Sequence, residues 1–138
     1  MSSKILVDEL AGKTATGNIT VTSEGGSATM QLQQGLAKAF ISFDGVGTVS
    51  TDTSFNISTL TDNAAADYSI TYTNNMDTSN HPITGSVVGS GEINYYSFIT
   101  SAGVAQTTSV DRVASVHNNG SSNNDQDPVH LVTHGDLA

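Results

Sequence analysis

Apolar and polar residues alternate with a period of two over short stretches of this chain. Residues 38–43 and 68–72 show it best: Ala39, Ile41 and Phe43 fall on one side of the first, and Tyr68, Ile70 and Tyr72 on one side of the second. A period of two is that of a β-strand with one buried face. The pattern predicts strands over 18–22, 28–33, 38–43, 54–59, 68–72, 83–88, 93–100, 104–116 (one long or two short) and 128–134.

Turn-forming residues separate these stretches at short intervals. The predicted breaks are Asp44-Gly45, Thr61-Asp62-Asn63, Asn74-Asn75, Asn80-His81-Pro82, Gly89-Ser90-Gly91, Ser101-Ala102-Gly103 and the polar loop 118–127. Regular spacing of this kind is typical of a sandwich. The best helix candidate, Met30 to Phe40, has Gly35 in its middle, which costs a helix about 1 kcal/mol relative to Ala.

The chain therefore divides into an arm and a domain. Residues 1–36 are too polar to fold alone, apart from one apolar cluster of Ile5, Leu6, Val7 and Leu10. We expect residues 37–138 to form an all-β domain, an antiparallel β-sandwich or jelly-roll-like fold of about eight or nine strands, with residues 1–36 as an extended N-terminal arm.

Composition narrows the classes of function. The 138 residues carry a net charge of −9 with only four Lys and Arg, so the sequence predicts neither nucleic-acid binding nor attachment to an anionic membrane. There is no Cys, and residues 1–10 do not read as a signal peptide, so we expect synthesis in a cytoplasm without export. Only 36% of the residues are hydrophobic, and so thin a core suggests that neighbouring subunits supply part of the burial.

No constellation in the sequence predicts catalysis, a cofactor or a metal. His130 and His134 have the spacing of a helical metal pair, but on a strand their Cα atoms lie roughly 13 Å apart. In a trimer, three copies of one of these histidines would be able to meet on the axis; surface or interface histidines are the better interpretation. The aspartates at positions 62, 67, 77, 125 and 127 fall in predicted loops without the ladder and glycine of a calcium loop.

The four tyrosines are the candidates for an aromatic contact surface. Tyr68 and Tyr72 fall on the predicted buried face with Ile70. Tyr95 and Tyr96 are consecutive, so they point to opposite faces of a strand. Whichever of them faces outward is a candidate for subunit or receptor contact. His130 and His134 are further candidates for such a contact.

Two stretches resemble a domain found at the C-terminal end of tail-fibre proteins of bacteriophages, especially marine ones. They are AKAFISFDGVGTV (residues 37–49) and SFNISTLTDNAAADYSITYTNNM (residues 54–76). The family has an aromatic strand that ends in Asn/Asp-Gly, then a segment of the form SFN, TDN and DY. The start, SKILVDEL (residues 3–10), is similar to the N-termini of marine phage fibre-like proteins. Phe40 stands where the family usually has Trp, the last strand lacks the family's apolar ending, and no long shaft precedes the domain.

The resemblance implies a non-enzymatic structural protein on the exterior of a virion, assembled in the host cytoplasm and functioning as a homotrimer. Its expected partners are its own copies, other virion proteins and possible host-surface glycans, with no nucleic acid and no membrane insertion. We interpret it as a tail-fibre-like, receptor-binding module. The alternative is a capsid decoration protein or small head fibre, because the chain is short and begins with an arm. Ile5, Leu6, Val7 and Leu10 are then the predicted virion-attachment residues.

Overall fold

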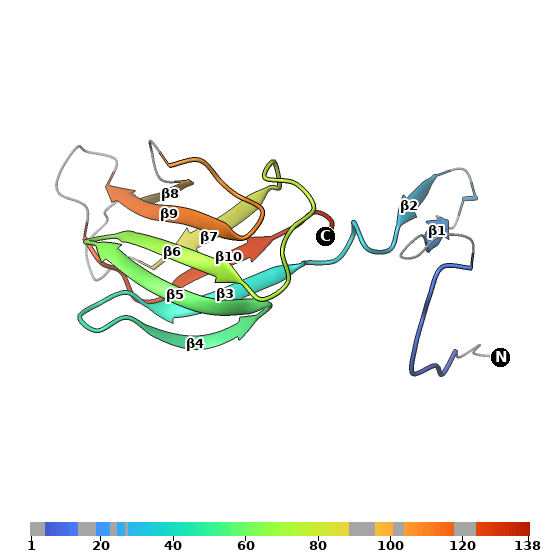
Figure 1. The fold of residues 1–138 in the computed structure, drawn as a ribbon, viewed down its shortest axis with the longest axis horizontal. Coiled ribbons are helices and arrows are strands. Elements are labelled where there is room, and N and C mark those ends of the chain that lie inside the picture. The colour runs from blue at the N-terminus through green and yellow to red at the C-terminus, as the bar shows by residue number, and fades with distance from the viewer. Residues whose placement is uncertain are drawn as a thin grey trace. The chain divides into compact units, whose positions relative to one another are not determined.

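The computed structural model describes residues 5–13, 19–22, 25–26, 28–88, 96–100, 104–117 and 124–138, with backbone alone at 96–100 and 117. These residues fall into two compact units, Met1–Leu36 and Ala37–Ala138. The ribbon in Figure 1 shows a small hairpin in the first unit and a two-layered domain in the second. Each unit is described below by itself.

The N-terminal unit contains one short antiparallel hairpin. Strand β1 (Thr20–Thr22) pairs with β2 (Thr29–Gln31), so that Val21 lies opposite Met30. Both of these apolar side chains are exposed. An isolated two-stranded hairpin is marginally stable in water, so this unit contributes little folding free energy of its own. Residues 32–36 form turns, and no helix occurs in the described part of the predicted candidate region Met30 to Phe40.

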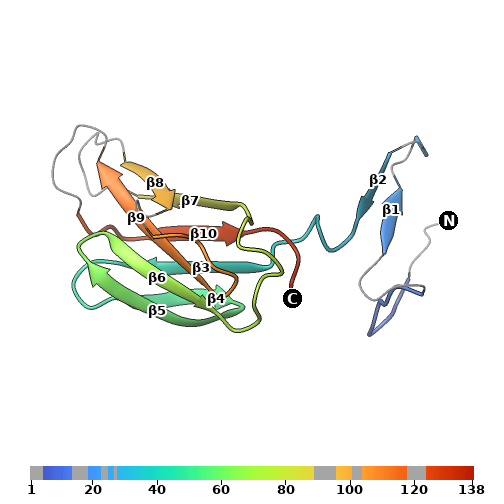
Figure 2. The same cartoon turned by 45° about the horizontal axis from the view of Figure 1, so that its top comes forward.

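The second unit is a sandwich of two four-stranded antiparallel sheets. Their strand orders are β4-β3-β10-β7 and β5-β6-β9-β8. The strands are β3 (Ala39–Asp44), β4 (Ser50–Phe55), β5 (Ile57–Ala64), β6 (Asp67–Tyr72), β7 (Ile83–Val87), β8 (Tyr96–Thr100), β9 (Val110–His117) and β10 (Val129–Thr133). Figure 2 shows the two layers from a second direction. The prediction of an all-β, sandwich-like domain is confirmed. Nothing in the described ranges forms a helix long and apolar enough to cross a membrane.

The core lies between the two sheets and follows the alternation seen in the sequence. Its central buried residues are Ile41, Phe43, Tyr68, Ile70, Val113, Val129 and Leu131. The ring of Phe43 meets that of Tyr68 edge to face, with centroids 4.8 Å apart. This edge-to-face geometry is one that aromatic pairs prefer. The predictions that Ala39, Ile41 and Phe43 share the inner face of β3, and that Tyr68 and Tyr72 are buried with Ile70, are confirmed.

The predicted single strand over 54–59 is wrong, because the chain changes sheets at Asn56. Strand β4 ends at Phe55 in one sheet and β5 begins at Ile57 in the other. Asn56 has a φ of 59°, a left-handed conformation that Asn tolerates better than most residues. Its Nδ2 donates to the carbonyls of Lys38 and Asn74, both at 3.1 Å, and its Oδ1 accepts from the Asn74 backbone N–H at 2.8 Å. These bonds hold the corner.

Two further predictions about strand ends are wrong. The expected break at Thr61-Asp62-Asn63 lies inside β5, where Thr61 pairs with Ser69 and Asp62 with Tyr68. These polar residues are tolerated there because β5 is an edge strand with exposed side chains. The expected strand over 104–116 starts only at Val110. Before it, the Thr107 hydroxyl accepts from the Val110 backbone N–H at 2.8 Å and stabilises a turn.

Candidate interaction surface

The outer face of the β4-β3-β10-β7 sheet carries an exposed aromatic pair. Phe40 on β3 lies opposite Phe55 on β4 and Val132 on β10, and Val132 lies opposite Thr84 on β7. The two phenyl rings stack with centroids 5.9 Å apart and an interplanar angle of 24°. Phe40 is 38% exposed and Phe55 is 54% exposed. The rings therefore stack face toward face, and Phe55, on the edge strand β4, leaves its other face toward solvent. We call this stacked pair the platform.

A polar row runs beside this platform across the same four strands. Ser42 lies opposite Thr53 and His130, and His130 lies opposite Ser86. The register shifts between Ser42 and Phe43, which leaves Asp52 as an extra residue in β4. The Ser42 hydroxyl donates to Asp52 Oδ2 at 3.2 Å. We call this surface the Phe40 face; it comprises Phe40, Phe55, Val132, Thr84, Ser42, Asp52, Thr53, Ser86 and His130.

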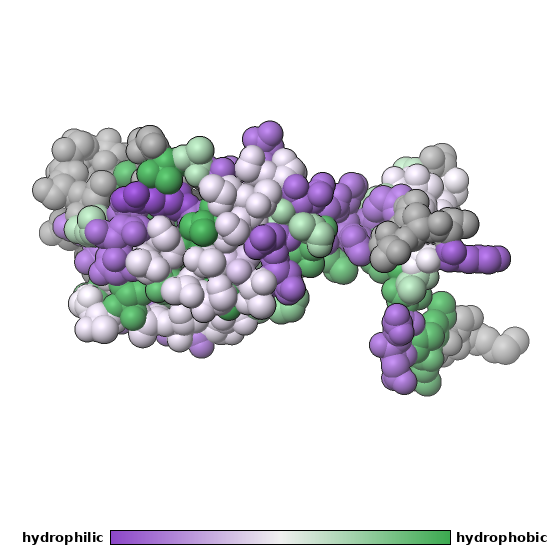
Figure 3. Space-filling view, in the orientation of Figure 1, coloured by the Kyte–Doolittle hydropathy of each residue, from purple (hydrophilic) through white to green (hydrophobic). Residues whose placement is uncertain are grey.

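The Phe40 face exists because β3 alternates strictly. Ile41 and Phe43 enter the core, so Phe40 and Ser42 must point to the other side of the sheet. The sequence alone places Phe40 and Ile41 on opposite faces of the same strand. It does not reveal that Phe55, on another strand, stacks on Phe40. The cross-strand register supplies that pairing. On the side of the sandwich shown in Figure 3, apolar residues are scattered among polar ones.

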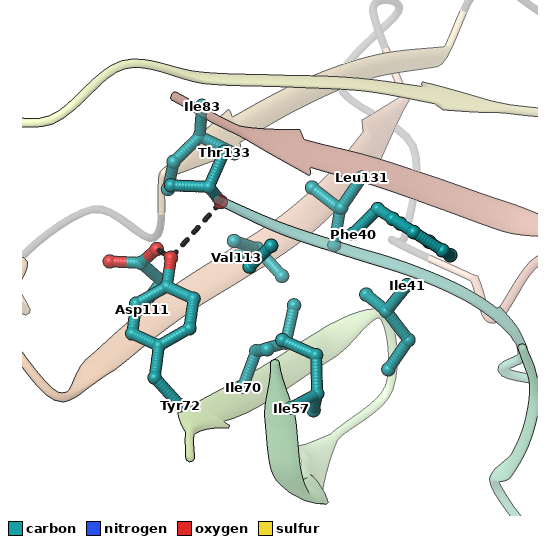
Figure 4. A pocket seen from close by; sticks show the side chains of 11 residues that line it. Phe40, Ile41, Ile57, Ile70, Tyr72, Ile83, Asp111, Val113, Leu131 and Thr133 are labelled. Carbon is teal, nitrogen blue, oxygen red and sulfur yellow. Dashed lines mark hydrogen bonds between the residues drawn. The ribbon is translucent and has the colours of Figure 1, made fainter. Parts of the chain in front are cut away.

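A very small cavity lies in the interior of the sandwich. Its volume is about 10 Å³, and Figure 4 shows aliphatic side chains such as Ile41, Ile70 and Leu131 lining it beside Tyr72 and Asp111. A space of this size accommodates about one water molecule. The cavity is therefore a packing defect of the core and is too small for an organic ligand.

A buried polar cluster adjoins this cavity. The Tyr72 hydroxyl donates to Asp111 Oδ2 and lies 3.0 Å from the Thr133 hydroxyl. His81 Nε2 lies 3.0 Å from both carboxylate oxygens of Asp111, and its Nδ1 lies 2.8 Å from the carbonyl oxygen of Thr78. Burial is the main cause that raises the pKa of the Tyr72 phenol above its ordinary value, and the hydrogen bond to Asp111 raises it further.

This cluster combines His, Asp and a hydroxyl, but its surroundings do not suit catalysis. The His81 side chain is 0% exposed and the Asp111 side chain 2% exposed. A general base must come within hydrogen-bond reach of its substrate, and no substrate reaches these atoms in this conformation. The cluster links the segment around His81 to β6, β9 and β10, and so it connects the two sheets.

A second buried tyrosine is held by an aspartate that the sequence placed in a loop. The Tyr68 hydroxyl donates to Asp125 Oδ1 at 2.8 Å, and the Ala66 backbone N–H donates to the same oxygen at 2.6 Å. Ala66 has a φ of 60° and ends the turn between β5 and β6. Burial, followed by the bond to Asp125, raises the pKa of the Tyr68 phenol.

The outer face of the other sheet carries a salt bridge. Arg112 Nε and Nη2 donate to the two Asp67 oxygens at 2.8 and 2.6 Å. The hydrogen bond from the guanidinium is the main cause that lowers the pKa of the Asp67 carboxyl. Asp67 and Arg112 share this face with polar side chains such as Ser69 and Thr71, so it is solvated and differs from the Phe40 face.

The residues that the sequence nominated are divided between the two units, and one of them lies outside the described residues. Ile5, Leu6, Val7 and Leu10 are all exposed, between 58% and 89%. His130 is exposed on the Phe40 face, whereas His134 is half-buried just after β10. Tyr95 lies outside the described residues, and for Tyr96 the structure gives only the backbone, which pairs with His117. Of the nominated residues, His130 alone is placed on the Phe40 face.

The sequence analysis missed the residues that matter most here. It did not single out Phe55 as a surface residue, nor His81 and Asp111 as a buried pair 30 residues apart in the chain. Within the described ranges, no group of three or more His, Asp or Glu side chains is placed to hold a metal ion. No family profile, curated protein sequence or solved structure matches this chain.

Proposed function

We propose that this protein is a non-enzymatic structural protein of a bacteriophage particle, assembled in the host cytoplasm and carried on the exterior of the virion. In this proposal it is a tail-fibre-like, receptor-binding module that functions as a homotrimer. The resemblance of residues 37–49 and 54–76 to phage tail-fibre domains motivates the assignment to a phage.

The observation that carries the proposal is that the resembling stretches form one mutually supporting block. The Asp44-Gly45 turn of the first stretch packs on Tyr68 of the second, whose hydroxyl lies 3.4 Å from the Gly45 carbonyl oxygen. Asn56, from the same second stretch, makes the corner between the two sheets. Residues of the two resembling stretches thus contact each other in the fold, which supports their interpretation as parts of one domain.

The two-unit organisation supports a role in attachment. The sandwich has its own core, whereas the N-terminal unit exposes Ile5, Leu6, Val7 and Leu10. Exposed apolar side chains on a polar segment fit a surface that binds a partner. In the second candidate function, a capsid decoration protein or small head fibre, this arm anchors the domain to the capsid by adding to an exposed sheet edge.

Copy number in purified virions tests both functions. A tail protein is expected in a handful of trimers per particle, and a decoration protein in hundreds of copies; quantitative gel analysis or mass spectrometry of virions distinguishes them. The absence of the protein from virions contradicts the proposal as a whole. The trimer is tested separately by mass photometry of the purified chain, where a stable monomer contradicts it.

A further inference from the structure

We infer that the Phe40 face binds a neutral carbohydrate, with Phe40 and Phe55 as the stacking platform. This inference rests on the proposed receptor-binding role, because it gives that role a ligand class and a location. It does not involve Tyr95 or Tyr96, which the sequence nominated for receptor contact.

The platform has the geometry that a sugar ring requires. A pyranose ring presents one face of C–H groups, which is apolar and packs on the face of an aromatic ring. The two phenyl rings are within 24° of parallel and are centred 5.9 Å apart, so Phe40 backs one face of the Phe55 ring. Phe55 is 54% exposed although it has a neighbouring ring to pack on, so its outer surface remains open for a ligand.

The polar row supplies the hydrogen-bonding groups that a sugar also needs. Hydroxyl groups of a sugar both donate and accept, and so do the hydroxyls of Ser42 and Thr53. Asp52 accepts a hydrogen bond from Ser42 on this face, which leaves its carboxylate with further acceptor capacity. His130 lies opposite Ser42 on the next strand and is exposed. An apolar platform with a few polar groups at its edge is the general composition of a small-molecule site.

A second copy of the chain fits this face less well because the apolar area is small. A Phe side chain presents on the order of 200 Å², so the exposed fractions of Phe40 and Phe55 together leave roughly that area uncovered. A stable protein interface buries about 800 Å² on each partner. Around the platform, the face is composed mainly of short hydroxyl side chains. The area therefore matches a small ligand better than a subunit.

Charge limits the ligand to neutral sugars. None of the four strands of this sheet contains Lys or Arg, Lys38 directly before β3 is only 6% exposed, and Asp52 places a carboxylate beside the platform. The chain as a whole carries a net charge of −9. Sialic or uronic acids would meet repulsion without a paired cation, whereas hexoses and N-acetylhexosamines carry no charge to repel.

The test is an NMR titration of the full chain with neutral oligosaccharides of glucose, galactose, mannose and N-acetylglucosamine. Oligosialic and oligogalacturonic acids serve as anionic probes. We expect at least one neutral series to shift the resonances of Phe40, Phe55 and Ser42, and Phe55→Ala to weaken that binding by about tenfold or more. Anionic probes are expected to leave these resonances unchanged.

Val46→Ala is the matched control, because Val46 is also 54% exposed but lies in the turn after β3. It should change affinity by less than about twofold. Since Phe40 is less exposed and its loss can affect folding, Asp52→Ala serves as the second variant on the face and should also weaken binding. The amide spectrum of each variant reports whether it is folded.

Any one of three binding results overturns the inference. Either no neutral series shifts the resonances of the Phe40 face, or Phe55→Ala and Asp52→Ala both bind as tightly as the parent, or the anionic probes bind there equally well. Self-association that Phe55→Ala abolishes also overturns it, since a second copy would then occupy the face. These outcomes are independent of virion copy number, so failure of the inference and failure of the proposed function are distinguishable.

Discussion

Gly45 lies directly against the phenol of Tyr68, so that a Cβ added at Gly45 would overlap the tyrosine hydroxyl oxygen. The same atom would be 2.9 Å from the carbonyl oxygen of Gln126. The Gly45 N–H also donates to that carbonyl at 2.9 Å, which fixes the approach of the backbone. The glycine is therefore required by close packing between the turn after β3 and the core tyrosine.

We predict that Gly45→Ala destabilises the sandwich by about 3 kcal/mol, at the upper end of the usual cost of overpacking. The neighbours are backbone and a fully buried ring, which cannot move aside cheaply. Urea denaturation measures the loss. Gly25→Ala is the control, because a Cβ there meets nothing within 4 Å. Equal midpoints for the parent and Gly45→Ala would contradict the close approach.

Alternation predicted the inner faces of β3 and β6 correctly, because burial in a half-exposed sheet follows a period of two whatever the fold's topology. The strand order could not be predicted in this way, since pairing β3 with β10 joins residues about 90 positions apart. The Phe40–Phe55 platform depends on the register between β3 and β4. The His81–Asp111 contact depends on which loop packs against β9. Both are tertiary facts that no local pattern contains.

The corner at Asn56 shows a different limit of sequence reasoning. Phe55, Ile57 and Thr59 keep a period of two across it, so the pattern alone predicts an uninterrupted strand. Only the left-handed φ of Asn56 and its side-chain hydrogen bonds reveal the corner. Asn56 both forms a corner and fits the alternation of a strand. Its conformation therefore cannot be assigned from the sequence without knowing which strands form each sheet.

We predict that Asn56→Ala lowers the free energy of unfolding by about 2 kcal/mol, because it removes the side-chain bonds and leaves a β-carbon in a left-handed conformation. Asn56→Gly also removes the side-chain hydrogen bonds, but glycine adopts the left-handed conformation without a steric cost. It should therefore destabilise the domain less than Asn56→Ala. Denaturation of both variants gives the comparison. If Asn56→Gly is the more damaging substitution, the left-handed conformation is not what favours Asn at this corner.

We predict that Asp111→Asn costs about 3 kcal/mol, because it breaks a buried network while preserving its shape. One of the two oxygens facing His81 and Tyr72 becomes an NH₂ group, which cannot accept their hydrogen bonds. Asp67→Asn is the matched control, since it makes the same chemical change in a partly exposed salt bridge and should cost much less. Equal losses in urea denaturation would show that Asp111 is not held as described.

The Asp67–Arg112 pair predicts a contribution to stability that depends on acid pH. The pKa of the Asp67 carboxyl is lower in the folded state than in the unfolded state. The ion pair therefore stabilises the fold above the unfolded carboxyl pKa of about 4. This contribution is lost as the pH falls through the folded-state pKa. The difference in stability between the parent and Asp67→Asn should therefore be present at pH 6 and shrink as the pH falls below about 4. A difference that stays constant across this range would contradict the ion pair.

Tyr68 and Tyr72 predict the behaviour of the domain in alkali. Burial, reinforced by the bonds to Asp125 and Asp111, raises the pKa of each phenol above the ordinary value of about 10. A raised folded-state pKa means that the stabilisation is complete below pH 10 and is lost as the pH rises further toward the folded value. Tyrosinate absorbance should therefore show a late phase that coincides with unfolding by circular dichroism. Tyr68→Phe should remove part of that late phase and leave any earlier one unchanged. A single titration near pH 10 that precedes unfolding and includes all four tyrosines would show that neither phenol is held in the core.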